Sequence, residues 1–140
     1  MATRLQKYYE GFASERESAL HRLGEHFTDD IHFRDPFRET HGMPAFRELF
    51  VRMFKQYPTV AFDSFRIDGD DRAFTLTYVM RLGMVVGPEF VTPMASVCRV
   101  RAGEDRVSDL LDFYDFSSSL VSPFPLVAAA YRKLVNALFL

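Results

Sequence analysis

Four strand-like segments follow one another between residues 60 and 116, and this order constrains the fold more than any other feature. The clearest segment has apolar residues at every second position: Phe74, Leu76, Tyr78, Met80 and Leu82. Such alternation is typical of a strand with one buried face. Turn residues at 68–71 and 102–105 join neighbouring segments, which favours antiparallel pairing. A change of phase near Ser64 in the first segment predicts a β-bulge that bends the sheet.

Three helical segments precede these strands. The first is expected to be capped by Thr3, and the second begins at a capping box, Ser14-Glu15-Arg16-Glu17. The third begins at Gly42-Met43-Pro44 and ends before Pro58. Helices followed by consecutive strands predict an α+β fold, in which a long, strongly curved and mainly antiparallel sheet packs against three N-terminal helices.

The composition excludes several classes of protein. The 140 residues are 48% hydrophobic and include 15 Phe, which is enough for one domain with a real core. A net charge of −2 without a basic cluster argues against nucleic acid as a partner. The single cysteine, Cys98, permits no internal disulfide. Because no apolar run is long enough to span a bilayer and residues 1–7 do not resemble a signal peptide, we expect a cytoplasmic protein without stable membrane insertion.

An acidic residue occupies an apolar position near residue 35. In a strand, Asp35 would point to the same side as Ile31, Phe33 and Phe37. A carboxyl group in apolar surroundings has a raised pKa and suits proton transfer. The alternative is a structural role, in which Asp35 caps the turn before Pro36 or pairs with an arginine: Arg34, Arg38 or Arg81.

Asp112 repeats this situation in the last strand, Val107 to Phe116. Both faces of that strand carry apolar residues, so both faces are expected to be covered. One face would meet the helices and a cavity, and the other would meet a second subunit in a homodimer. Asp112 is therefore either a functional acid or a buried acid whose hydrogen bonds are satisfied.

The histidines show no spacing typical of a metal site. His21 and His26 lie five residues apart on the second helix, which does not bring them onto one face in register. His32 is expected to point outward, and His41, near Glu39, is a candidate for the pocket mouth. No glycine-rich phosphate loop or nucleophile elbow is present, so neither a metal nor a cofactor is predicted.

Three further motifs carry a family resemblance. They are Phe27-Thr28-Asp29-Asp30-Ile31 leading into Arg34-Asp35-Pro36, Gly42 before the third helix, and the closing Asp112-Phe113-Tyr114-Asp115. With them, residues 5–116 resemble the nuclear transport factor 2-like superfamily, which includes ketosteroid isomerases and SnoaL-like polyketide cyclases. The resemblance implies a cone-shaped domain with an apolar pocket between sheet and helices, and dimerisation through the outer sheet face.

The resemblance also implies roles for individual residues. Asp35 matches the general base of ketosteroid isomerases, and Tyr9, or Tyr8 in another register, lies near their oxyanion-binding tyrosine. Their second oxyanion donor would fall near Ala95, which cannot donate a hydrogen bond. Asp112 matches an acid kept by some SnoaL-like cyclases, and is expected to act as a second acid or to orient a water molecule.

The expected function follows from these assignments. The pocket is expected to bind a small apolar molecule and to catalyse cofactor-independent proton transfer, as an isomerase or cyclase would. The alternatives are a non-catalytic ligand-binding module or a protein adaptor of the same fold. The expected pocket residues are apolar or aromatic: Phe12, Phe33, Phe50, Phe54, Tyr78, Met94 and Tyr114.

The last twenty residues form a separate segment. Pro123-Phe124-Pro125 interrupts the chain, and apolar residues then recur at helical spacing from Leu126 to Phe139. We therefore expect a domain over residues 1–120 and a C-terminal helical extension over 121–140. Such a helix could close the core, clasp a second subunit, cover the pocket or rest on a membrane surface.

Overall fold

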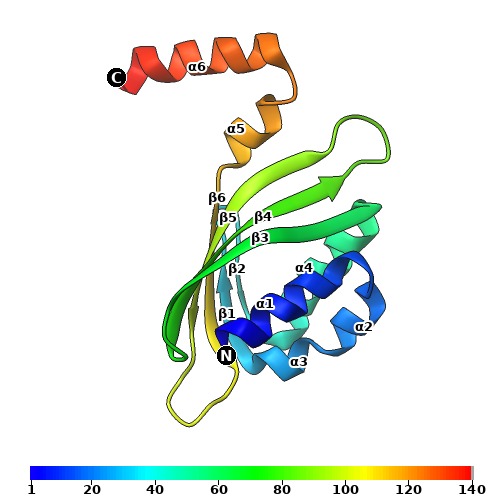
Figure 1. Cartoon of the computed structure of the whole chain (residues 1–140), viewed down its shortest axis with the longest axis vertical. Helices are drawn as coiled ribbons and strands as arrows, with labels where there is room; N and C mark the ends of the chain where they lie inside the picture. Colours follow the sequence, from blue (N-terminus) through cyan, green and yellow to red (C-terminus); the bar gives the residue numbers. More distant parts are fainter. Residues whose placement is uncertain (140) are drawn as a thin grey trace.

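A curved six-stranded sheet forms one side of the domain, and helices cover its concave face in the computed structural model of the chain, which describes residues 1–139 (Figure 1). The strand order is β2-β1-β6-β5-β4-β3. Neighbouring strands are antiparallel except β1 and β6, which are parallel. The strands are β1 (Phe27–Arg34), β2 (Glu39–His41), β3 (Thr59–Gly69), β4 (Ala73–Gly83), β5 (Phe90–Arg99) and β6 (Val107–Tyr114). The predicted α+β fold with a mainly antiparallel, cone-like sheet is confirmed.

The predicted bulge and hairpin are present in β3 and β4. The pairing register shifts between Asp63 and Arg66, and Ser64 takes a positive φ of 60°. The hairpin turn begins at Gly69, whose φ is 113°. A side chain at Gly69 would bring its Cβ within 2.3 Å of the carbonyl oxygen of Ala73, so only glycine fits there.

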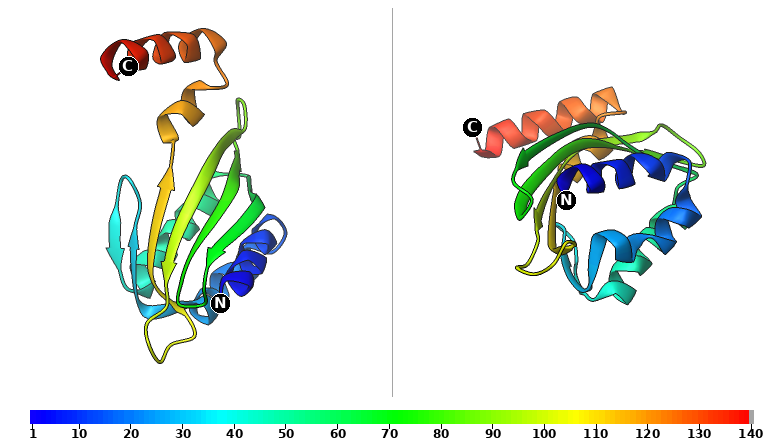
Figure 2. Two further views of the ribbon diagram at one scale, coloured as in Figure 1. Left: turned by 60° about the vertical axis from the view of Figure 1, so that its left-hand side comes forward. Right: turned by 60° about the horizontal axis from the view of Figure 1, so that its bottom comes forward.

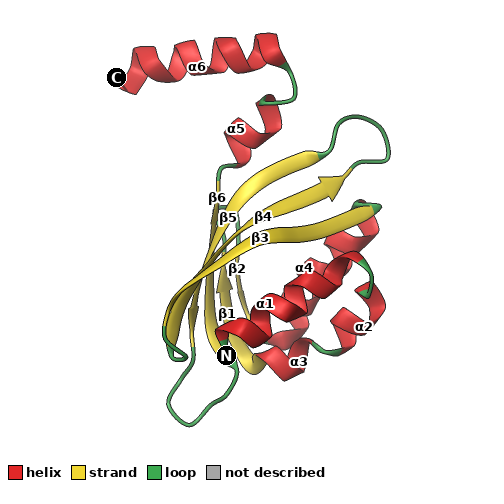
Figure 3. Cartoon of the chain, in the orientation of Figure 1, coloured by secondary structure: helices red, strands yellow, loops and turns green. Residues whose placement is uncertain are grey.

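The helices between residues 2 and 56 pack on the concave face, as Figures 2 and 3 show. α1 contacts β3 and α4 contacts β1. Four short elements precede β1: α1 (Ala2–Glu10), the 3-10 helix η1 (Gly11–Ala13), α2 (Arg16–His21) and α3 (Leu23–His26). One long helix, α4 (Met43–Gln56), follows β2. The start of α4 at Met43, with Pro44 in its first turn, was predicted correctly.

Three details of the helix prediction were wrong. Thr3 lies inside α1, because the helix already begins at Ala2 and Met1 is its N-cap residue. Ser14 does not cap α2: the N-cap residue is Glu15, which makes no side-chain capping bond. The second helix is also divided, because the backbone leaves the helical region at Arg22 and begins again as α3.

The C-terminal part differs from the expectation in two respects. The last strand ends at Tyr114 rather than Phe116, and a further short helix, α5 (Phe116–Val121), spans the expected domain boundary. The extension itself is helical, as predicted: α6 covers Pro125–Phe139, packs against α5 and stands away from the sheet (Figure 1). Of the helices that the structure describes, none is long and apolar enough to cross a membrane bilayer.

Aromatic rings dominate the core between sheet and helices. Phe12 is fully buried, and its ring meets the rings of α1, α4 and β3 mostly edge to face, with centroids 4.9–5.6 Å apart: Tyr8, Tyr9, Phe50, Phe54 and Phe62. This packing fixes α1 and α4 against the sheet. The space left beside it on the concave face is the cavity described next.

Candidate functional site

A cavity of about 540 Å³ lies between the concave face of the sheet, α1 and α4. Its walls are mainly aromatic and aliphatic side chains, and its mouth is bordered by the β4–β5 loop and the segment around α5. Met84 and Val86 from that loop and Leu120 and Phe124 from the α5 segment are exposed apolar residues at the mouth. The volume falls within the range of small-molecule sites, and the apolar walls suit an apolar ligand.

The structure places most of the expected pocket residues on the cavity wall. They are Phe33, Phe50, Tyr78, Met94 and Tyr114. Phe12 and Phe54 are not part of the wall, because Phe12 lies in the fully buried layer behind it and Phe54 packs against Phe12 and under the guanidinium group of Arg16. Both therefore support the wall rather than form it.

Asp35 and Asp112 both line the cavity, and the strand register explains why. In the parallel pair β1–β6, Phe33 lies opposite Leu110. Asp112 comes two residues after Leu110 within β6, and Asp35 directly follows the end of β1 at Arg34, so both acids line the cavity at the same end of the two strands. The expectation that Asp35 lies within a strand was wrong, because the chain bends at Pro36, and Phe37, which was expected on the same apolar side, is 63% exposed. The negative charge of Asp35 is close enough to raise the pKa of Asp112. The pairing of β1 with β6 therefore places the two predicted acids in one site.

Asp35 is held by a dense set of hydrogen bonds. Its Oδ1 accepts from the backbone N–H groups of Phe37 and Arg38 at 2.8 and 2.9 Å. Its Oδ2 pairs with Nε of Arg38 at 2.9 Å and accepts a long bond, 3.5 Å, from the hydroxyl of Tyr114. Of the arginines considered from the sequence, Arg38 is thus the partner. An Asp35 oxygen could take a proton from a substrate only by giving up some of these contacts.

Replacing Asp35 by alanine is expected to lower the free energy of unfolding by about 2 kcal/mol. The side chain is only 5% exposed, and its loss leaves two turn N–H groups and Arg38 without their acceptor. Asp35→Asn is the matched control, because it keeps an acceptor for the turn and should cost about half as much. Urea denaturation measures both. Equal effects of the two substitutions would contradict the turn-holding role.

Asp112 stands in a different environment, on the cavity floor. Its Oδ1 accepts a hydrogen bond of 2.5 Å from Ser96, and the Ser96 oxygen lies 2.9 Å from the hydroxyl of Tyr78. Among the described residues, Oδ2 of Asp112 has no hydrogen-bond partner, so it is available to a ligand. Burial raises the pKa of Asp112 to about 7, the Ser96 bond opposes this rise, and the charge of Asp35 adds to it. A carboxyl group that titrates near neutral pH suits proton transfer.

Ser96 was not anticipated from the sequence. It lies on β5, where Met94 and Cys98 are also buried, and it pairs with Asp112 across the β5–β6 hairpin. The turn at 102–105 sets that register. The sequence could therefore have identified Ser96 as a serine at an inward position opposite an acid. Ala95, considered from the resemblance as the place of an oxyanion donor, occupies the outward-facing position between Met94 and Ser96.

The raised pKa of Asp112 predicts a pH-dependent stability. The folded protein binds this proton more tightly than the unfolded chain, so the stabilisation is complete below about pH 4 and is lost as pH rises towards 7. Asp112→Asn does not titrate. The variant should therefore gain about 2–3 kcal/mol relative to the unsubstituted chain between about pH 5 and pH 8. Urea denaturation across this range measures the difference, and a constant difference would refute the assignment.

Tyr9, rather than Tyr8, reaches the cavity. Its ring packs at 5.8 Å from that of Tyr78, and no hydrogen-bond partner of its hydroxyl occurs in the part of the chain that the structure describes. Burial, Tyr78 and the charge of Asp112 raise the pKa of Tyr9 well above its ordinary value, so the hydroxyl remains a donor. Tyr8 points elsewhere: it donates to the carbonyl of Ala19 at 2.7 Å and stacks on His26.

The comparisons with known proteins agree with this fold. The chain has a nuclear transport factor 2-like fold of the ketosteroid isomerase-like kind. It belongs to the SnoaL-like domain family, whose model matches residues 5–108. No curated protein matches the chain.

Two solved structures illustrate the likeness. A proposed polyketide cyclase from Xanthomonas campestris pv. campestris is 18% identical with a TM-score of 0.70, over 85% of this chain and 93% of that one. A protein with a ketosteroid isomerase-like fold from Catenulispora acidiphila, in complex with trimethylamine, is 18% identical with a TM-score of 0.69, over 85% of this chain and 89% of that one. At these identities the likeness shows the fold alone.

Proposed function

We propose that the cavity binds a small apolar carbonyl compound and catalyses proton transfer beside its carbonyl group, with Asp112 as the acid–base residue. The observation that carries the proposal is a carboxyl group on the floor of an apolar cavity, with one oxygen that has no partner among the residues that the structure describes. The polyketide cyclase activity proposed for the fold neighbour from Xanthomonas campestris is consistent with such chemistry. The sequence led to the expectation that Asp35 is the general base, and the present proposal assigns this role to Asp112 instead.

The geometry suggests a simple sequence of steps. Ionised Asp112 takes a proton from the carbon beside the carbonyl through Oδ2, and the electron pair moves to the carbonyl oxygen. The Tyr9 hydroxyl donates a hydrogen bond to that oxygen as its charge develops, which such donors can favour by about 3–4 kcal/mol. Protonated Asp112 then returns the proton to the same or a neighbouring carbon, and a return to a neighbouring carbon is an isomerisation. Asp35 holds the turn and, through its charge, keeps the pKa of Asp112 high.

Deuterium exchange tests this proposal without knowledge of the natural substrate. The probe is 2-tetralone, a two-ring apolar ketone with acidic C–H bonds beside its carbonyl, in D₂O followed by proton NMR. The protein should accelerate exchange, and the acceleration should fall when Met94→Trp obstructs part of the cavity. Binding of the probe, measured by ligand-observed NMR, without accelerated exchange would favour the alternative, a non-catalytic binding module.

We also propose that the outer sheet face forms a homodimer. This face carries partly exposed apolar side chains in register across three strands, including Val79, Ala95, Val97, Leu111 and Phe113. Phe113 is the most exposed of them, at 51%. A continuous apolar patch of this kind is typical of protein interfaces.

The dimer proposal predicts that Phe113→Lys gives a monomer. The lysine would place a charge on the apolar face, and loss of an aromatic contact that is a hot spot of an interface costs about 2 kcal/mol or more. Light scattering coupled to size-exclusion chromatography measures the mass, and Glu17→Lys, at an exposed position of α2 on the helical side of the sheet, is the control. A monomeric unsubstituted chain would contradict the proposal.

A further inference from the structure

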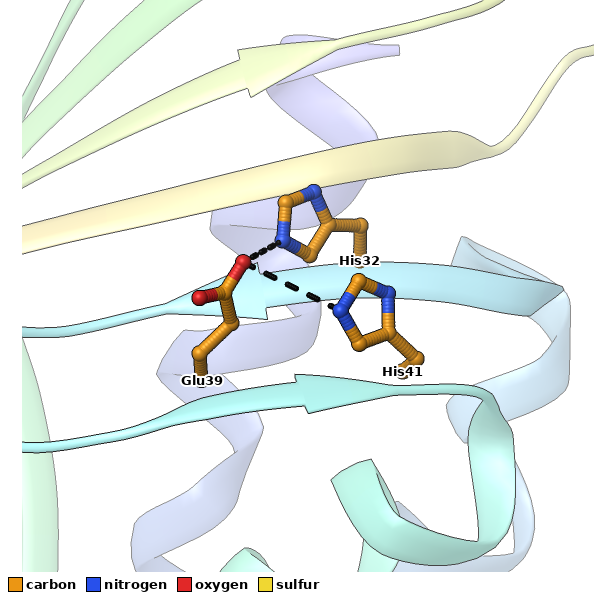
Figure 4. A group of neighbouring side chains, drawn as sticks. All are labelled: His32, Glu39 and His41. Atoms are coloured by element: carbon orange, nitrogen blue, oxygen red, sulfur yellow. Dashed lines mark hydrogen bonds and ion pairs between the residues drawn. The ribbon is translucent and has the colours of Figure 1, made fainter.

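Three side chains with metal-binding atoms meet at the edge of the sheet, away from the cavity: His32, Glu39 and His41 (Figure 4). In the antiparallel pair β1–β2, His32 lies directly opposite His41. Glu39 is two residues before His41 on β2, so both point to the same face. The short strand β2 was not anticipated from the sequence, and without it these residues could not be placed together.

The ligand atoms of this cluster already converge. Nε2 of His32 lies 2.6 Å, and Nε2 of His41 3.8 Å, from the same oxygen of Glu39. The two imidazole rings are stacked, with centroids 4.4 Å apart and planes 7° from parallel. One ligand atom from each residue lies within 4.8 Å of the others. Two imidazoles and one carboxylate form a common ligand set for Zn²⁺ and related divalent ions.

A fourth side chain supports the cluster from the neighbouring strand. Oδ1 of Asp109, on β6, lies 3.7 Å from Nδ1 of His32. A carboxylate at the far nitrogen of a histidine fixes the ring so that its other nitrogen faces the metal, which is the usual arrangement around bound zinc. Because the His41 side chain is 72% exposed, an ion can enter and solvent can complete its coordination.

We propose that His32, Glu39 and His41 bind one divalent transition-metal ion per chain, of which Zn²⁺ is the representative. Both histidines bind through Nε2 and Glu39 through its carboxylate, and Asp109 is a positioning residue. The charge of Arg34, which acts on Glu39, opposes the incoming cation and limits the affinity. This proposal differs from the expectation from the sequence, which was that no metal is bound. The site lies outside the cavity, so it is independent of the proposed proton transfer.

Metal titration of the tag-free full-length chain, stripped with chelator and dialysed, tests the proposal. Calorimetry with ZnCl₂ should give one ion per chain, and CoCl₂ should give the visible absorption of a four-coordinate cobalt ion. His41→Ala should weaken zinc binding by more than ~100-fold and Asp109→Asn by ~10-fold, because an outer partner of a ligand usually contributes ~10–100-fold. His21→Ala, which changes an exposed histidine on α2, is the matched control and should bind zinc normally.

Two results would overturn the proposal. One is the absence of saturable zinc binding to the unsubstituted chain, which would leave the cluster as a cross-strand ion pair. The other is the same zinc affinity in His41→Ala and His21→Ala, which would place any bound zinc elsewhere. Glu39→Gln, at a half-exposed position, is a second substitution of a proposed ligand. Circular dichroism verifies that each variant is folded.

Discussion

Replacing Asp112 by asparagine is expected to slow protein-catalysed deuterium exchange of 2-tetralone by ~10²–10⁴-fold, the usual contribution of a positioned acid–base group. Asparagine keeps an oxygen that can accept the hydrogen bond from Ser96, so the cavity floor should keep its shape. The variant should therefore bind the ketone about as tightly as the unsubstituted chain. Proton NMR measures the exchange rate and ligand-observed NMR the binding.

Two control variants make this result specific. Asp68→Asn removes an exposed acid on β3 and should leave the exchange rate unchanged. Asp35→Asn should keep most of the rate, because Asp35 is assigned to the turn and to the pKa of Asp112. A large loss of exchange rate in Asp35→Asn together with a small loss in Asp112→Asn would instead assign Asp35 as the base, as the resemblance implied.

Replacing Phe12 by alanine is expected to lower the free energy of unfolding by about 3–5 kcal/mol. The ring is fully buried and lies in contact with five aromatic rings, so its removal leaves a cavity that the rigid neighbours cannot fill. Tyr9 and Phe50, two of those neighbours, also line the ligand cavity, so the affinity for an apolar ketone should fall as well.

Urea denaturation of two further variants calibrates this effect. Phe12→Leu keeps most of the volume and should cost less than about 1.5 kcal/mol. Phe37→Ala removes a ring that is 63% exposed and should cost less than about 1 kcal/mol. If Phe12→Ala cost no more than Phe37→Ala, Phe12 would not support the cavity wall.

Much of the fold was predictable because its elements have strong periodicity. β4 alternates strictly and α4 has a continuous apolar stripe behind Pro44, so both were located correctly. β2 was missed because a three-residue strand has no period to detect. The interruption at Arg22 was missed because one residue outside the helical region does not alter the apolar spacing.

The site was predictable in part, for a physical reason. Alternation identified Asp112 as an acid on an apolar face, since that depends only on strand geometry. Asp35 reaches the same cavity from the turn after β1, which alternation does not describe. The choice of Arg38 over other arginines depends on the turn after Asp35, where backbone N–H groups and the guanidinium group converge. The difference between the two acids depends on burial and on Ser96, which only the packed sheet defines.

A pH titration of the Asp112 side-chain carboxyl by carbon-13 NMR is the decisive measurement for the acid–base role of this residue. Asp112→Asn identifies the resonance by its loss. We expect a midpoint near pH 7, because the carboxyl is buried on the cavity floor beside the charge of Asp35. A midpoint below about pH 5, within the ordinary range of aspartate, would contradict the assignment of Asp112 as the acid–base residue.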